Sequence, residues 1–327
     1  MKPTVVEICT GGGGQALGLE LAGFEMLAAI EIEPKYCDTL RLNRPHWNVI
    51  QADVRNINGT EFKGADLFAG GVPCPPFSIA GKQLGKMDDR DMFPEALRLI
   101  GEIDPKAVLL ENVPGFASEK FAGYRKVLMS KLKDMGYTPD WRILHASNYG
   151  VPQLRPRFVL VALKSEYASA FCWPEPIGES PTVGSALFDL MAVRGWKGAA
   201  SWSSKANTVG PTLVGGSLKH GGPDLGPTRA RRQWEFLSVD GRSIADAAPD
   251  AGFAVDGMPR LTIKMAARIQ GFPDFWQFAG KKTSAYRQIG NAFPPPVAEA
   301  VGSAIMNTLT FASMMKIPIR RKTLRAA

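Results

Sequence analysis

Two residues of the sequence combine reactive side chains with unusual surroundings. Cys74 lies in a proline-rich stretch, GGVPCPPFS at 70–78, and Glu111 ends an apolar run with Asn112 beside it. A proline-rich loop is an unusual place for a packing cysteine, and the end of a buried strand is unusual for a surface carboxylate. A cysteine is suited to nucleophilic attack and a buried carboxyl to proton transfer, so the pair could support covalent catalysis.

A second set of residues could bind a ligand. In the stretch GGGGQALG, Gly11, Gly13 and Ala16 fit a loose G-x-G-x-x-A pattern after a short apolar run. Glycines let a ligand approach the backbone closely, and a helix N-terminus favours negative charge. Glu31 and Asp53 each follow a predicted strand, where the first could bind ribose hydroxyls and the second an adenine amino group. This pattern fits a nicotinamide enzyme as well as a methyltransferase.

Predicted strands and helices alternate along the first half of the chain, and these elements must position the residues named above. Apolar runs predict strands at 5–8, 26–30, 48–51, 65–69 and 107–111, and helical spacing predicts helices at 15–22, 34–43, 93–103 and 121–135. This alternation predicts an α/β, Rossmann-like fold, a mostly parallel sheet with helices on both faces. Ligands bind outside the carboxyl ends of such strands, so the glycine cluster, Glu31, Asp53, Cys74 and Glu111 should share one edge.

The alternation stops about midway along the chain. Residues 164–258 are rich in Gly, Pro, Ser and charged residues, and the segment is too long for a loop within a compact domain. Regular patterning resumes near Leu261. We therefore expect a catalytic domain at 1–163, a smaller irregular domain at 164–258, and a return segment at 259–327 that completes the first domain.

The composition of the chain limits the classes of protein to which it can belong. The chain has 327 residues, a net charge of +8 and a pI of about 9.3, which suits a polyanionic partner such as nucleic acid. No apolar run reaches the roughly 18 to 20 residues that span a bilayer, and no secretory signal is visible, so we expect a soluble, cytoplasmic protein. The four cysteines form no C-x-x-C pair and only three histidines are present, so neither a metal site nor disulfides are expected.

Five stretches together resemble the DNA (cytosine-5) methyltransferase family of bacterial and phage restriction-modification systems. They are the Pro-Cys loop, the Glu-Asn-Val strand end at 111–113, YGVPQLRPR at 149–157, the stretch from LT to RIQGFP at 261–273, and QIGNAFPP at 288–295. The resemblance runs from about Thr4 to Ile305. The resemblance is specific because the stretches follow the order and spacing of the family. The family's target-recognition region coincides with the irregular segment.

The resemblance implies methyl transfer from S-adenosyl-L-methionine (AdoMet) to carbon 5 of cytosine in a specific double-stranded DNA sequence. Cys74 would add to ring carbon 6, Glu111 would hold a proton at N3, and Arg157 would bind O2 and orient Glu111. Arg155 or Arg157 would raise the thiolate fraction of Cys74. The target base is unreachable in a stacked duplex, so it would be flipped into the pocket.

The resemblance also assigns binding residues. The expected cofactor-binding residues are Cys9, Thr10, Gly11, Gly13, Gly14, Glu31, Ile32, Asp53, Val54, Pro73 and Asn291. The expected substrate- or DNA-binding residues are Ser78, Asn112, Gln153, Thr212, Arg229, Arg231 and Arg232.

Four positions depart from the family pattern. Cys9 and Ile32 stand beside the expected adenine site, where the family has Phe and often a large apolar or aromatic residue. Pro75 follows the catalytic cysteine where Gln is usual, and Met265 stands where most members have Glu. The changes concern cofactor contacts and loop motion, and they leave the expected reaction class unchanged.

Three other functions fit parts of the sequence less well. An RNA cytosine-5 methyltransferase acting on transfer RNA shares the fold, but the run TLVGG from Thr212 and the arginines 229, 231 and 232 favour DNA reading. A nicotinamide dehydrogenase would leave the Pro-Cys and Glu-Asn-Val stretches unexplained. A catalytically silent DNA-binding protein would leave the reactive residues without a purpose. We expect a monomer, with a cognate restriction endonuclease as a candidate genetic partner.

Overall fold

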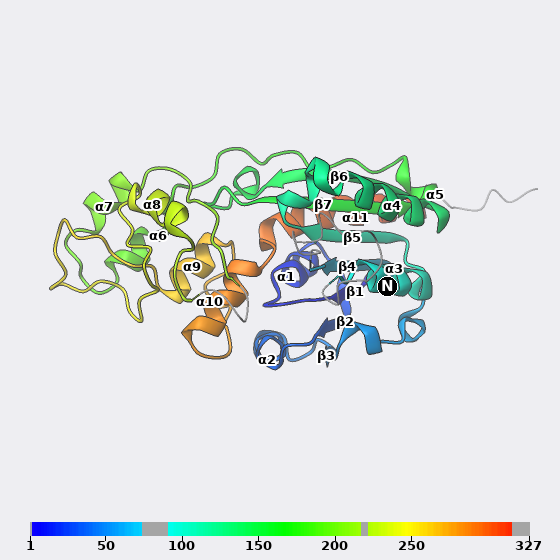
Figure 1. Ribbon diagram of the computed structural model, residues 1–327, viewed down its shortest axis with the longest axis horizontal. Coiled ribbons are helices and arrows are strands. Elements are labelled where there is room, and N and C mark those ends of the chain that lie inside the picture. Colours follow the sequence, from blue (N-terminus) through cyan, green and yellow to red (C-terminus); the bar gives the residue numbers. More distant parts are fainter. Residues whose placement is uncertain (1, 74–90, 217–221, 316–327) are drawn as a thin grey trace, which may run out of the picture.

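A seven-stranded sheet forms the centre of the protein, whose computed structural model describes residues 2–73, 91–216 and 222–315 (Figure 1). The strand order is β3-β2-β1-β4-β5-β7-β6. The strands are β1 (Thr4–Ile8), β2 (Glu25–Glu31), β3 (Val49–Gln51), β4 (Leu67–Gly71), β5 (Ala107–Asn112), β6 (Tyr137–His145) and β7 (Pro156–Lys164). The first five strands are parallel, and β7 is antiparallel to β5 and β6. The prediction of a mostly parallel sheet is confirmed.

Alternating side chains of the central strands enter two apolar clusters, one on each face of the sheet. In β1, Val5 belongs to one cluster and Val6 to the other, as the two-residue period of a strand requires. The helices α1 (Gly14–Leu21) and α11 (Pro295–Met315) cover the Val5 face, and α3 (Phe93–Ile103) and α4 (Ala122–Asp134) cover the Val6 face. Helix α2 (Pro34–Asn43) packs beside β2 and β3.

The glycine cluster serves packing as well as ligand approach. A Cβ atom on Gly14 would lie 2.3 Å from the Phe293 carbonyl oxygen, and one on Gly18 would lie 2.4 Å from that of Pro295. Helix α1 can therefore pack closely against the start of α11 only because these positions carry no side chain. This contact brings the Asn-Ala-Phe-Pro stretch to the glycine loop.

Strands β6 and β7 were not predicted from the sequence. Antiparallel pairing places Phe158 of β7 opposite Asn112, the last residue of β5. The start of β7 therefore lies at the same edge as the carboxyl ends of the parallel strands. This reversal brings Arg157 to the edge that carries Glu111.

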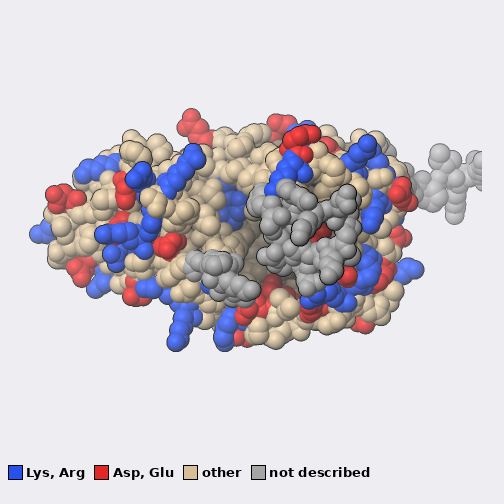
Figure 2. Space-filling view, viewed as in Figure 1, with Lys and Arg blue, Asp and Glu red and all other residues tan. Residues whose placement is uncertain are grey.

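The irregular segment contains short helices rather than strands. They are α5 (Ser165–Ala168), α6 (Val183–Ala192), α7 (Ala199–Lys205) and α8 (Thr228–Glu235), and the described part of 165–258 otherwise has only isolated β-bridges. Helix α5 packs on β6, β7 and α11, and thus lies with the sheet. Helices α6 to α8 form a smaller lobe beside α9 (Ile263–Ile269) and α10 (Lys282–Asn291) (Figure 1). The space-filling view shows a hollow between this lobe and the larger one (Figure 2).

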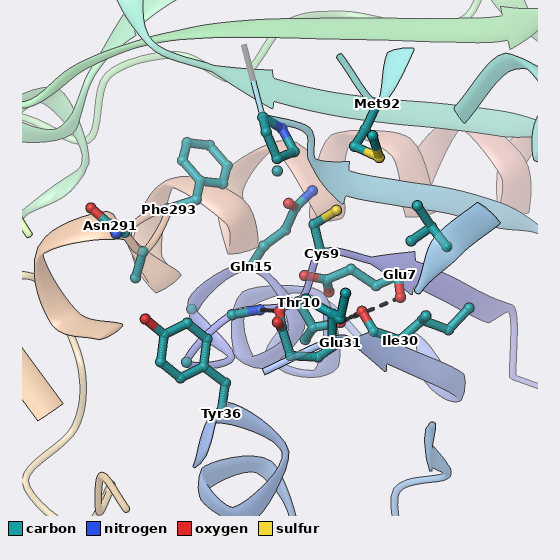
Figure 3. Close-up of a pocket in the computed structure, with 18 of the residues that line it drawn as sticks. Glu7, Cys9, Thr10, Gln15, Ile30, Glu31, Tyr36, Met92, Asn291 and Phe293 are labelled. Carbon is teal, nitrogen blue, oxygen red and sulfur yellow. Dashed lines mark hydrogen bonds between the residues drawn. The ribbon is translucent and has the colours of Figure 1, made fainter. Parts of the chain in front are cut away.

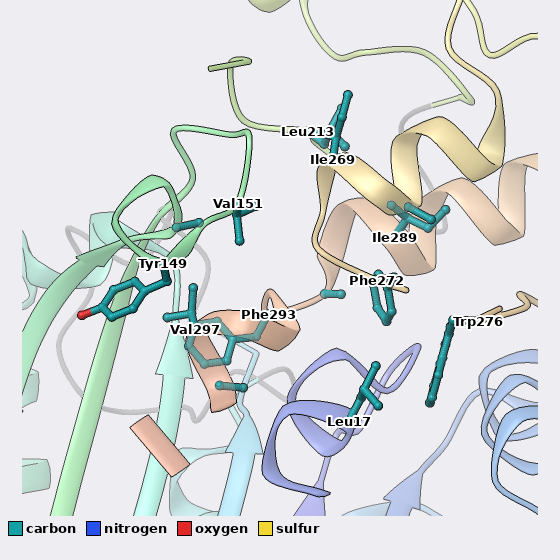
Figure 4. Packing of buried hydrophobic residues seen from close by; sticks show 14 of the residues in the cluster. Leu17, Tyr149, Val151, Leu213, Ile269, Phe272, Trp276, Ile289, Phe293 and Val297 are labelled. Atoms are coloured by element: carbon teal, nitrogen blue, oxygen red, sulfur yellow. The ribbon is translucent and has the colours of Figure 1, made fainter. Parts of the chain in front are cut away.

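One apolar cluster extends from the sheet into the smaller lobe. Figure 4 shows Leu17 and Phe293 near the sheet, and Phe272, Ile289 and Leu213 leading toward the lobe. Since these side chains are buried in one cluster, the two lobes share a core. Among the described residues, no helix has the length and apolar character needed to cross a bilayer.

Candidate cofactor and catalytic site

A cavity of about 440 Å³ opens at the carboxyl edge of the sheet (Figure 3). Most of the expected cofactor residues line it: Cys9, Thr10, Gly11, Gly14, Glu31, Ile32, Asp53, Val54, Pro73 and Asn291. Gly13 is not among the lining residues. It packs against the side chains of Leu40 and Trp276, and a Cβ atom at this position would lie 2.8 Å from each. Glu111 lines the same cavity, so the candidate catalytic acid and the cofactor residues share one space.

Glu31 is held in a fixed orientation at the end of β2. Its Oε2 accepts a hydrogen bond from the Gly11 N–H at 2.7 Å, and its Oε1 accepts one from the Glu33 N–H at 2.9 Å. Burial raises the pKa of the Glu31 carboxyl, although these backbone N–H groups oppose the rise. The carboxyl therefore ties the glycine loop to β2 while it faces the cavity.

Asp53 is paired with a neighbouring arginine. The Arg55 side chain donates from Nε to Oδ1 at 3.0 Å and from Nη2 to Oδ2 at 2.5 Å. These hydrogen bonds lower the pKa of Asp53, so its carboxylate stays ionised. An adenine amino group at Asp53 would share the carboxylate with Arg55.

The two departures at the expected adenine site differ in exposure. Cys9 has a φ of 53°. Burial raises the pKa of its thiol, as do the nearby carboxylates of Glu31 and Glu7, so the thiol stays neutral. Ile32 is 61% exposed at the rim of the cavity. Aromatic surface comes instead from Tyr36 and Phe293, which sequence reasoning did not assign. Tyr36 lies in the first turn of α2, and no pattern in the sequence indicated it.

A buried ion pair joins β5 to β7 beside the cavity. The Nε atom of Arg157 lies 2.7 Å from Oε1 of Glu111, and both side chains are about nine-tenths buried. Burial raises the pKa of Glu111, while Arg157 and Arg155 pull it down; the net direction is upward. A raised pKa favours the protonated carboxyl that the expected chemistry at cytosine N3 requires.

Arg155 is fully buried and ties three segments together. Its Nη1 donates to the Leu213 carbonyl at 2.8 Å, and its Nη2 donates to the carbonyls of Gly290 and Ala292, each at 2.8 Å. We expected Arg155 to act near the reacting cysteine. Its contacts favour a positioning role at the junction of β7, the smaller lobe and α10.

Gln153 and Asn112, two of the expected substrate- or DNA-binding residues, are bonded within the protein. Both are buried, with 0% and 4% exposure. Gln153 accepts from the Leu213 N–H at 2.8 Å and donates to the Ile269 carbonyl, while Asn112 donates to the Val72 carbonyl at 2.8 Å. Their buried amides already have protein partners, which favours a positioning role, and contact with the substrate stays a prediction.

The TLVGG run reaches the cavity through Asn291. The Nδ2 atom of Asn291 donates to the Gly216 carbonyl at 3.1 Å, and Thr212 is half-buried within the same run. Cys74 and Ser78 lie outside the described residues, so their predicted roles rest on the sequence.

The arginines of helix α8 have different environments. Arg229 and Arg232 are exposed, whereas Arg231 is half-buried and donates to the Thr228 hydroxyl at 3.3 Å. The lobe's other arginines, 194 and 242, form ion pairs with Asp250 and Asp240. No ion pair joins Arg229 or Arg232 to a carboxylate of the described residues. Figure 2 shows basic side chains gathered over α8 on the face that carries the hollow.

The comparisons with known proteins agree on one family. The model of the C-5 cytosine-specific DNA methylase family matches residues 3–307. The Type II methyltransferase M.NaeI of Lentzea aerocolonigenes is 57% identical over 309 residues, which cover 93% of this chain and 75% of that protein. The Type II methyltransferase M.NgoMIV of Neisseria gonorrhoeae is 55% identical over 317 residues, which cover 94% of this chain and 99% of that protein.

Solved structures share the fold at low sequence identity. The Entamoeba histolytica methyltransferase EhMeth is 16% identical, with a TM-score of 0.67 over 94% of this chain and 99% of its own. The S. pombe Dnmt2 methyltransferase is 18% identical, with a TM-score of 0.65 over 94% of this chain and all of its own.

Proposed function

Because the chain belongs to the C-5 cytosine-specific DNA methylase family, we propose that its sheet edge brings AdoMet and a flipped cytosine together for methyl transfer. The chain is a DNA cytosine-5 methyltransferase that takes its methyl group from AdoMet. The observation that carries the proposed site is that Glu111, buried and paired with Arg157, lines the same cavity as the glycine loop. Incubation with methyl-labelled AdoMet, followed by bisulfite sequencing, should locate the modified cytosines; label transferred to RNA in preference to DNA would contradict it.

The chemistry of the cavity fits AdoMet. Carboxylates of Glu31 and Asp53 suit hydroxyl and amino groups, Tyr36 and Phe293 offer aromatic surface, and the glycine loop leaves room for close approach. Bound AdoMet would supply an activated methyl group. Glu31 would bind the ribose hydroxyls, and Asp53 would accept from the adenine amino group.

Replacement of Glu31 by alanine is expected to weaken AdoMet binding. Loss of a hydrogen-bonded carboxylate should cost on the order of 1 to 3 kcal/mol, measured by calorimetry. Glu33→Ala is the matched control, because only the backbone N–H of Glu33 contacts Glu31 in the structure. Unchanged affinity in Glu31→Ala would exclude the ribose contact.

The catalytic step would use three residues around the flipped base. Cys74 would add to C6, Glu111 would hold the proton at N3, and Arg157 would bind O2 while it orients Glu111. A neutral carboxyl beside N3 limits the negative charge that builds up on the ring as the thiolate adds. The buried guanidinium of Arg157 fixes that carboxyl against β7.

The exposed arginines of α8 would contact DNA phosphates or base edges. We expect Arg229→Ala and Arg232→Ala each to weaken binding on all sequences and reduce the salt slope by about one, if they bind phosphate. A base contact would instead relax specificity at one position. Arg231→Ala should have a smaller effect, because Arg231 is half-buried against Thr228.

Measurement of DNA affinity over a range of salt concentrations tests this assignment. Arg242→Ala is the matched control, since Arg242 is exposed in the same lobe but pairs with Asp240. If Arg229, Arg231 and Arg232 can be neutralised together without any change in binding, α8 does not contact DNA.

The remaining expectations concern the domains, the oligomeric state, the location and the genetic partner of the protein. Residues 1–163 and 259–327 would form the catalytic domain, and residues 164–258 would form the target-recognition domain. Because α5 packs on the sheet and one apolar core runs through both lobes, the boundary between the two domains would not be sharp. We expect a monomer that works in the cytoplasm, where the chromosome lies. Relatives named as Type II methyltransferases support a restriction endonuclease as genetic partner.

A further inference from the structure

The phenylalanine that follows helix α8 is left in water. Phe236 is 84% exposed, and among the described residues no large apolar side chain is more exposed. Its N–H donates to the Arg232 carbonyl at 3.3 Å, so its backbone continues the helix by one residue. The ring therefore projects from a helical backbone. Contact with a partner would remove this apolar surface from water, which is favourable.

The two exposed arginines of α8 share a side of the helix with this ring. A helix turns by about 100° per residue, so Arg229, Arg232 and Phe236 fall within an arc of about 60°, with Phe236 between the arginines. Trp234 and Arg231 lie on the other side of the helix, where the first is fully buried and the second half-buried. The exposed face of α8 is therefore a phenylalanine flanked by two arginines.

The positive charge of this face is not neutralised within the described part of the chain. The ion pairs of the lobe involve other arginines, such as Arg242 with Asp240, and none joins Arg229 or Arg232 to a described carboxylate. Glu235, the only acidic residue of α8, lies near Arg242 and, after Asp240, raises the pKa of that arginine. The exposed face therefore suits a partner that combines negative charge with apolar surface.

A duplex groove combines these properties. Phosphates line its edges and stacked bases form its floor. A helix rises about 1.5 Å per residue, so Arg229 and Phe236 are about 10 Å apart along α8, the length of about three base pairs. Arginine side chains are long enough to reach the edges while the shorter ring between them faces the floor. A second copy of this chain fits less well, because its net charge is +8.

We propose that Phe236 packs against base edges in a DNA groove whose phosphates Arg229 and Arg232 bind, an inference that rests on the proposed DNA contact of α8. The arginines would set the position of the helix along the duplex. The ring would then lie against the bases, where an apolar side chain makes a favourable contact with groups such as the thymine methyl. This contact releases no counterions, so its contribution would vary little with salt.

The salt dependence of binding separates the ring from the arginines. Phe236→Ala is expected to lower DNA affinity about tenfold at every salt concentration, with the slope of log affinity against log salt unchanged. Arg229→Ala should reduce that slope by about one. Phe236→Tyr keeps the ring and should retain most of the affinity. Fluorescence anisotropy with a labelled duplex that contains a site methylated by the protein gives these values, and thermal melting checks that each variant is folded.

Phe311→Ala is the matched control. Phe311 is also an exposed phenylalanine on a helix, and it lies near the end of α11, whose first residues pack on α1. Helix α11 has 21 residues and spans about 30 Å, so Phe311 lies away from the smaller lobe (Figure 1). This variant should bind DNA like the wild type.

Other outcomes would overturn the inference. Wild-type affinity in Phe236→Ala, together with weaker binding by Arg229→Ala, would leave the α8 contact in place without the ring. A reduced salt slope in Phe236→Ala would show that the ring only supports the arginines. A dimer that dissociates on this substitution, seen by sedimentation with DNA affinity unchanged, would assign the ring to a second copy. Wild-type protein that binds no DNA would instead overturn the proposed function.

Discussion

Cys74→Ser is expected to abolish the covalent complex between this protein and DNA that carries 5-fluorocytosine at the target position. Addition of Cys74 to C6 and methyl transfer to C5 must be followed by loss of the C5 proton before the enzyme is released. Fluorine at C5 blocks that elimination, so the wild-type adduct should survive a denaturing gel. A serine hydroxyl has no comparable population of reactive anion at neutral pH. Turnover should fall by about 10⁴-fold or more, the scale seen when covalent nucleophiles are removed.

The remaining cysteines give controls for this experiment. Cys172 is exposed and Cys37 is buried in α2, and neither lines the cavity. Cys172→Ser and Cys37→Ser should both retain the adduct. The adduct should also require AdoMet, since the complex stalls only after methylation. Peptide mapping that placed the crosslink on any other residue, or an adduct formed preferentially with 5-fluorocytosine in RNA, would contradict the assignment.

Glu111→Gln is expected to lower the rate of methyl transfer by about 10²- to 10⁴-fold, the usual contribution of a positioned acid. A glutamine amide can still donate a hydrogen bond to N3 but cannot give it a proton. AdoMet affinity, measured separately, should change much less than the rate. Arg157 would lose its ion-pair partner, so thermal melting is needed to show that the variant is folded.

The pH dependence of this variant provides a second readout. Burial raises the pKa of Glu111, so its protonated form persists to higher pH than for an exposed glutamate. Wild-type rates should therefore fall as pH rises through the raised pKa of Glu111. Glu111→Gln should lack the high-pH fall. A high-pH fall that persists in Glu111→Gln would assign that ionisation to another group.

The parallel half of the sheet could be predicted because its strands are apolar runs that end in distinctive residues. Glu31 and Glu111 stand at strand ends, and parallel strands bring such ends to one edge without any knowledge of side-chain contacts. Strands β6 and β7 were harder to predict, because antiparallel pairing depends on long-range contacts. The meeting of Arg157 with Glu111 follows from that pairing, and only the resemblance to a family indicated it.

Hydrogen-bond partners, rather than burial, distinguish the motif residues that are expected to act on a ligand from those that support the fold. Gln153 and Arg155 belong to the same short motif as Arg157, yet their polar groups are bound to backbone groups of the smaller lobe and α10.

Beside the shared apolar core, the junction between the two lobes includes several contacts to the main chain. The N–H and carbonyl of Leu213 are bound by Gln153 and Arg155, and a Cβ atom on Gly290 would lie 2.4 Å from the Gly215 nitrogen. Contacts to main chain persist when the side chain at the contacted position changes, provided that the two glycines remain. If the smaller lobe recognises the DNA sequence, as we propose, mutations at its exposed positions can therefore accumulate without disturbing its attachment. In evolutionary terms, specificity can diverge while catalysis is inherited intact, and exchange of the lobe between relatives becomes a feasible route to new targets.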